Sequence, residues 1–131
     1  MSATVIASGE SPLDLSAEVI RAGVDVVVVV TGGDRPHLGA VAAAEPRPSL
    51  DDPDVQSSTV SSLAYLGHKD DEIARHMARR MSSALGVKVA VTAGAHWDVL
   101  RPKEIAQVMA NAERLTALII ASLETAMLEG Q

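Results

Sequence analysis

A run of valines at residues 24–30, broken only by Asp25, constrains the fold more than any other feature of the sequence. β-branched residues favour extended backbone, and a nearly unbroken run predicts a central strand that is covered on both faces. Gly23 precedes the run and predicts a tight turn from segment 13–22, in which apolar and polar residues alternate. The alternation favours a strand, with a helix as the alternative, so we expect a hairpin.

Further strands are expected at residues 3–7, 38–44, 55–66 and 87–92, and clusters of Gly, Pro and Asp predict loops at 31–36, 45–54 and 93–98. A helix should follow residue 69, because apolar residues recur at four-residue spacing from Ile73 to Leu85. Gly86 is placed to end it, and Pro102 suits the first turn of a second helix.

The second helix carries a long apolar stripe, which predicts its buried side: Ile105, Val108, Met109, Ala112, Leu115, Ile119, Leu123 and Met127. Leu118 and Ile120 lie off that stripe and form a second apolar edge, which suggests a contact between subunits. With strands at the front and helices at the back, we predict an α+β fold: a largely antiparallel sheet of about six strands packed with two C-terminal helices. Residues 1–131 are expected to form one domain.

Composition disfavours several classes of function. The chain has no cysteine, so thiol chemistry and disulfides are excluded. Its net charge is −6, and it has no Phe, one Tyr and one Trp, whereas nucleic-acid binders usually present a basic surface with aromatic side chains. The start of the chain lacks the pattern of a signal peptide, and no apolar run approaches the ~20 residues of a membrane span. We therefore expect a cytoplasmic protein that contacts neither membrane nor nucleic acid.

Three expected loops concentrate polar residues that the apolar pattern does not explain. In the first, residues 31–39, Gly32 and Gly33 suit a nest of backbone N–H groups for phosphate, and Arg35 adds a positive charge. The alternative is a tight turn that needs positive φ. In the second, residues 67–71, Lys69 precedes a helix N-terminus, where anions bind; the alternative is a helix cap formed by Asp70.

The third loop, residues 94–98, contains Trp97 between His96 and Asp98. The indole ring suits stacking on a planar ligand, and the alternative is a core Trp that closes the sheet edge. His37, His68 and His96 lie in different loops that border strands, so a metal site is a further alternative, although no His-Glu-x-x-His spacing supports it. No nucleophile motif or Ser-His-Asp order is present, so the sequence does not predict an enzyme.

Taken together, three segments resemble the prenylated-flavin chaperone family, the D-type accessory proteins of gallate-decarboxylase-like enzymes. They are Val30-Thr31-Gly32-Gly33 with Pro36-His37-Leu38-Gly39-Ala40-Val41, then Gly67-His68-Lys69-Asp70-Asp71, then Val91-Thr92-Ala93-Gly94-Ala95-His96-Trp97-Asp98. The resemblance implies a fold like that of proteasome-assembly chaperones, often dimeric. It also implies binding of reduced prenylated flavin mononucleotide (FMN) and its delivery to a flavin-dependent decarboxylase as client.

Carried onto this chain, the resemblance makes ten loop residues candidates for cofactor binding. We expect the phosphate near Gly32, Gly33, Arg35 and Lys69, and the ring system near His37, His96 and Trp97. The remaining candidates are Gly39, Gly67 and His68. On this hypothesis the chain is a carrier, a homodimer or higher homo-oligomer, and not an enzyme. Two alternatives remain open: a small metal-dependent enzyme that uses the loop histidines, and an assembly subunit without a small ligand.

Overall fold

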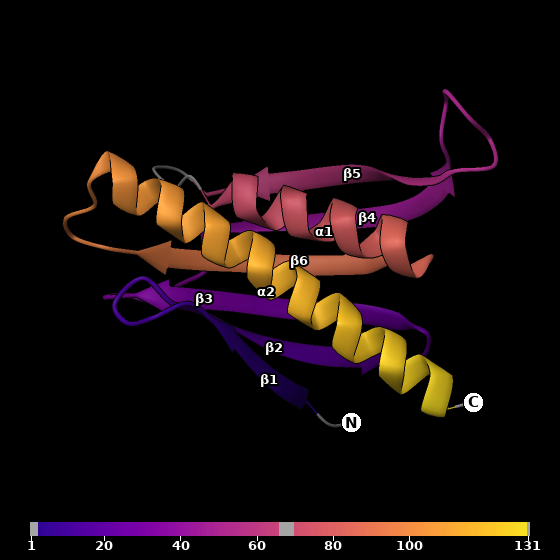
Figure 1. Ribbon diagram of the computed structural model, residues 1–131. Coiled ribbons are helices and arrows are strands. Elements are labelled where there is room, and N and C mark those ends of the chain that lie inside the picture. Colours follow the sequence, from indigo (N-terminus) through magenta and orange to yellow (C-terminus); the bar gives the residue numbers. More distant parts are fainter. Residues whose placement is uncertain (1–2, 66–69, 131) are drawn as a thin grey trace.

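The computed structural model describes residues 3–65 and 70–130. In chain order the elements are β1 (Ala3–Ser8), β2 (Leu15–Ala22), β3 (Asp25–Gly33), β4 (Ala40–Pro48), β5 (Gln56–Ala64), α1 (Asp71–Leu85), β6 (Val89–His96) and α2 (Pro102–Glu129). The predicted α+β class, the sheet of six strands and the two helices are confirmed (Figure 1). Segment 15–22 is a strand and pairs with β3 through a turn at Gly23, where φ is +66°, so the expected hairpin is also present.

The six strands form one sheet in the order β1-β2-β3-β6-β4-β5. Neighbouring strands are antiparallel except β3 and β6, which pair in parallel from Val26↔Val89 to Gly33↔His96. A parallel pair needs a long crossover connection, and β4, β5 and α1 supply it. The carboxyl ends of β3 and β6 therefore lie at the same edge of the sheet.

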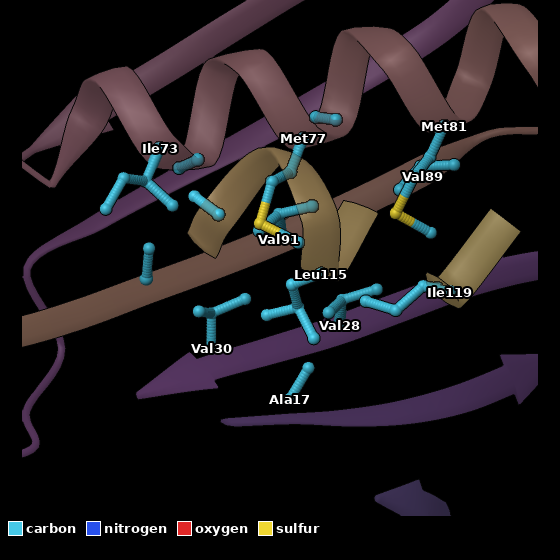
Figure 2. Close-up of a cluster of buried hydrophobic side chains, with 14 of the residues drawn as sticks. Ala17, Val28, Val30, Ile73, Met77, Met81, Val89, Val91, Leu115 and Ile119 are labelled. Carbon is cyan, nitrogen blue, oxygen red and sulfur yellow. The ribbon is translucent and has the colours of Figure 1, made fainter. Parts of the chain in front are cut away.

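The hydrophobic core lies between one face of the sheet and the two helices. Val28, Val30 and Val91 point from the sheet toward Met77 of α1 and Leu115 of α2 (Figure 2), and all five are fully buried. α1 covers β4, β5 and β6, whereas α2 covers β1 and β2. Small alanines on β4 let α1 approach closely, in keeping with a core that contains no phenylalanine.

The expectation that the valine strand is covered on both faces is wrong. Val26, Val28 and Val30 are buried, but Val27 and Val29 are only partly buried. The reason is that both helices lie on the same face of the sheet (Figure 1), so nothing within the described chain covers the other face.

Several predicted strand boundaries are also wrong, and the neighbouring loops differ accordingly. β4 begins at Ala40 and not at residue 38, and it continues to Pro48. Beyond Ala44 it pairs with β5 but no longer with β6, and a strand that is hydrogen-bonded on one side only tolerates proline. β3 continues through Gly33 and β6 through His96, because their parallel ladder extends that far.

The buried side of α2 differs from the predicted stripe at several positions. Ile105 is 49% exposed, and Ile120, expected at a second apolar edge, is 8% exposed and belongs to the core. Asn111 and Thr116 are buried although they are polar. The Asn111 amide donates to the Leu13 carbonyl (2.9 Å), and the Thr116 hydroxyl donates to the carbonyl one turn earlier (2.7 Å). Satisfied hydrogen bonds explain why polar residues are tolerated there.

Polar contacts also join the two helices at the surface. The Glu113 carboxylate of α2 accepts hydrogen bonds from the Arg80 guanidinium (2.9 Å) and from the His76 imidazole of α1. These partners, the His76 hydrogen bond first, hold the pKa of Glu113 below its ordinary value of 4.5. A carboxyl group whose folded-state pKa is lowered stabilises the fold above its ordinary pKa, and this stabilisation is lost as the pH falls through the lowered value.

We therefore expect Glu113→Gln to lower the melting temperature at pH 7, with a loss of about 1 kcal/mol or less because the side chain is half-exposed. The difference from wild type should shrink as the pH falls below 4.5, where wild-type Glu113 also becomes neutral. Thermal melts between pH 7 and about pH 3 measure this difference in melting temperature. Glu124→Gln, an exposed change on the same helix, is the control and should have little effect. If the melting temperature of Glu113→Gln stays as far below wild type at the lowest pH as at pH 7, the lowered pKa of Glu113 does not explain the difference in stability.

Candidate functional site

Most of the candidate residues gather at one end of the molecule. β3 and β6 end there, and α1 and α2 begin there (Figure 1). Ligands commonly bind beyond the carboxyl ends of parallel strands. The structure brings eight described residues to this end: Gly32 and Gly33 close β3, Arg35, His37 and Gly39 follow before β4, and His96 closes β6. Trp97 comes directly after β6, and Asp70 directly precedes α1. The other predicted residues, Gly67, His68 and Lys69, lie outside the described residues.

A pocket of about 310 Å³ opens between the end of β6 and the first turns of both helices. Its walls are mainly apolar, with contributions from Ile73, Val108 and Met109. His96 at the end of β6 and Trp97 directly after it line one wall, and Asp70 and Glu72 line the pocket at the start of α1. Small-molecule sites are typically concave, mostly apolar and about 300–1,000 Å³ in volume, with a few polar groups. This pocket fits that description at the small end of the range.

Trp97 is half-buried and lines this pocket, so it is not a fully enclosed core residue. Its indole N–H donates to the Pro12 carbonyl at 2.6 Å. This hydrogen bond fixes the orientation of the ring from a segment that is distant in sequence. The chain therefore holds a large planar side chain rigidly at the pocket wall.

Asp70 belongs to this site, although the sequence suggested only a helix cap for it. It precedes α1 in the N-cap position, but its side chain makes no cap hydrogen bond. Instead the buried carboxylate accepts from the Ala95 N–H (3.1 Å) and lies 3.2 Å from the His37 imidazole Nε2. Asp70 thus joins the start of α1, the end of β6 and the β3–β4 loop. No sequence signal separates this role from capping, because both place an Asp before a helix.

Close backbone approach accounts for three of the glycines at this end. A Cβ on Gly94 would collide with the His37 carbonyl, and one on Gly39 would collide with the Asp70 carboxylate. A Cβ on Gly33 would collide with the His96 carbonyl, and Gly33 also has φ +78°. Gly33 and Gly94 are glycine because segment 33–39 packs directly against β6, and Gly39 is glycine because it packs directly against Asp70.

Some polar groups near the predicted phosphate position already have partners within the chain. The backbone N–H groups of Asp34 and Arg35 both donate to the His96 carbonyl (2.7 and 3.3 Å). The Arg35 guanidinium is exposed and lies 2.6 Å from the Asp98 carboxylate and 2.8 Å from the His96 ring. An anion bound at this rim would therefore compete with Asp98 for Arg35.

His37, His68 and His96 are the histidines that the sequence offers as metal ligands. Within residues 3–65 and 70–130, no group of three or more His, Cys, Asp and Glu side chains is placed to hold a metal ion. His37 faces Asp70, and His96 faces Arg35 and Asp98. His68 lies outside the described part of the chain. Across that same part, no helix is both long enough and apolar enough to cross a membrane.

The fold matches that of a proteasome assembly chaperone. The crystal structure of a chaperone complex for yeast 20S proteasome assembly contains a chain that superposes with a TM-score of 0.55, at 20% identity, over 95% of this chain and 98% of that one. At this identity the match establishes the shared fold, as the resemblance in the sequence predicted.

The sequence itself identifies the family. Residues 9–124 match the family described as the prenylated flavin chaperone LpdD-like domain. The protein LpdD of Lactiplantibacillus plantarum (strain ATCC BAA-793 / NCIMB 8826 / WCFS1) is 31% identical over 104 residues, which are 78% of this chain and 71% of that protein. This chain therefore belongs to the LpdD-like prenylated flavin chaperone family, and the predicted resemblance is confirmed.

The packing of segment 33–39 against β6 makes a stability prediction. Gly94→Ala should destabilise the fold by about 1–3 kcal/mol, because the added methyl group meets main-chain atoms of His37 that have little room to move. Urea unfolding measures the loss. Ala90→Ser adds one atom at a partly exposed position of the same strand and should cost much less. Equal stability of the two variants would show that the close approach is not a constraint.

Proposed function

We propose that this chain binds reduced prenylated FMN in the pocket lined by Trp97 and delivers it to a flavin-dependent decarboxylase without catalysing a reaction itself. Membership of the prenylated flavin chaperone family supports this proposal. The choice of site rests on the apolar pocket at the strand ends, which has the chain's single tryptophan in its wall.

The pocket residues suit the ring system of such a cofactor. Met109, Val108 and Ile73 offer an apolar surface to a flat heteroaromatic ring, and Trp97 offers an aromatic one. Asp70 and Glu72 are acceptors for ring N–H groups. Carboxylates beside the pocket disfavour a phosphate there, so we place the phosphate at the rim near Arg35, with Lys69 as a second cation.

A carrier has to release its cargo, and the geometry of the pocket supports that role. Its volume suits a ring system better than a whole nucleotide, and it opens to solvent between the helix ends. The more polar part of the cofactor would then stay accessible to a client enzyme. The proposal includes a homodimer or larger homo-oligomer as the working form of the carrier.

Trp97 makes binding directly measurable, because it is the single fluorophore of its kind. Anaerobic titration with reduced prenylated FMN should quench its fluorescence to saturation. Met109→Glu should weaken binding by about tenfold or more, because an ionised carboxylate placed in an apolar pocket pays a desolvation cost.

Met127→Glu is the matched control. Met127 is also half-buried and lies on the same helix, about 27 Å along its axis from Met109. It should bind the cofactor as wild type does. Absence of saturable quenching, or equal affinity of the Met109 variant and wild type, would overturn the proposed site.

A further inference from the structure

β5 is an edge strand of the sheet, and it lacks the features that usually protect such an edge. It has nine residues and comes last in the strand order, and no described strand pairs with its outer side (Figure 1). Native proteins protect exposed edges with charged side chains, proline or a bulge, because free N–H and C=O groups can pair with another chain. β5 contains no charged residue and no proline, and its register with β4 is unbroken. Its outer side is therefore open to an added strand.

Two arginines of α1 lie beside this edge on the helix side of the sheet. The Arg75 guanidinium donates to the Ser62 hydroxyl of β5 at 2.8 Å. The Ser58 hydroxyl of β5 donates to the Arg79 carbonyl at 3.1 Å, and Arg79 itself is exposed. Because the two arginines are one helical turn apart, they follow the direction of the strand.

A third arginine lies beside β5 on the opposite face of the sheet. The Arg47 guanidinium of β4 donates to the Thr59 hydroxyl of β5 at 2.7 Å. Within the part of the chain that the structure describes, none of these three arginines has a carboxylate partner, whereas Arg80 of α1 is paired with Glu113. The edge of β5 thus carries positive charge that the described chain does not neutralise.

We infer that the outer edge of β5 receives an acidic extended segment of a partner protein, which joins the sheet as a seventh strand. In strand addition, backbone hydrogen bonds supply affinity and alternate side chains supply specificity. Acidic residues at alternate positions of the segment lie on one face, where Arg75 and Arg79 meet them. Ser58 and Ser62, which mark the places of the two arginines, are about 13 Å apart along the strand. Carboxylates four positions apart in the segment match this spacing.

Charge favours a different protein over a second copy at this edge. Two β5 edges that paired would bring the arginines of both copies together without a carboxylate between them, and like charges repel. The acidic residues near the edge lie at its ends: Asp51, Asp52 and Asp54 precede β5, and Asp71 begins α1. The carboxylates of the partner are therefore expected near the centre of its segment. β1 is also uncharged, but it has six residues and lies at the opposite edge of the sheet, away from these arginines.

Fluorescence polarisation with the full chain and a labelled eight-residue peptide of alternating Glu and Val tests this inference. Binding should saturate at low ionic strength and weaken as salt is added, because salt screens exposed charges. Arg75→Gln combined with Arg79→Gln should weaken binding by about tenfold or more, because two charge-assisted contacts are lost. The matched control combines Arg21→Gln with Arg114→Gln, which removes two positive charges from β2 and α2. It should bind the peptide as wild type does.

A modified peptide separates strand addition from general attraction of anions. Methylation of all its backbone nitrogens keeps every carboxylate but removes the N–H groups that would pair with β5, so binding should be lost. Hydrogen exchange gives a second readout. The unmodified peptide should slow amide exchange in β5 and leave exchange in β1, at the other edge of the sheet, unchanged.

Absence of saturable binding at low ionic strength, or equal binding of the methylated peptide, would overturn the inference. Equal affinity for a short single-stranded DNA would also overturn it, because the edge would then attract any polyanion. So would an equal loss of binding in the control variant. Neither Arg75 nor Arg79 lines the flavin pocket, so Trp97 quenching by reduced prenylated FMN should be unchanged in their double variant. That measurement tests the proposed function separately.

Discussion

The parallel pairing of β3 with β6 is the interaction on which the rest of the structure depends. It sets a valine-rich strand in the middle of the sheet and requires the long connection that contains α1. It also brings two strand ends, Gly33 and His96, to one edge, where both helices begin. The pocket, the buried Asp70 carboxylate and the glycines that allow close packing all lie at this edge.

Much of the fold could be predicted from local pattern, because each element has its own signal. The valine run, the turn at Gly23 and the four-residue spacing in α1 correspond to the observed elements. The boundaries that failed lie where tertiary contacts override local preference. Prolines in β4 are tolerated beyond Ala44, where β6 no longer pairs, and glycine in β6 permits close packing and does not mark a loop. In the run 26–30 every residue is valine, so the sequence does not show that only one face of the strand is buried.

The sequence predicted the polar residues of the candidate site better than its apolar ones. Loop polarity singled out His96 and Trp97, which do line one pocket. It did not identify Met109 or Val108, because apolar residues on a helix have the same pattern whether they face the core or a pocket. Asp70 was explained by helix capping, and only the three-dimensional contacts with Ala95 and His37 show another role. Binding by residues 67–69 stays a prediction.

The proposed carrier role needs a site that can hold a planar cofactor and leave it accessible, and we propose the small apolar pocket between the two helix ends as that site. The most direct test is transfer. Chain loaded with reduced prenylated FMN is mixed anaerobically with an apo-decarboxylase, and decarboxylation is followed against the same concentration of free cofactor. We predict faster or more complete activation by the loaded chain, with the advantage lost in Met109→Glu. Equal activation by free cofactor would contradict a delivery role.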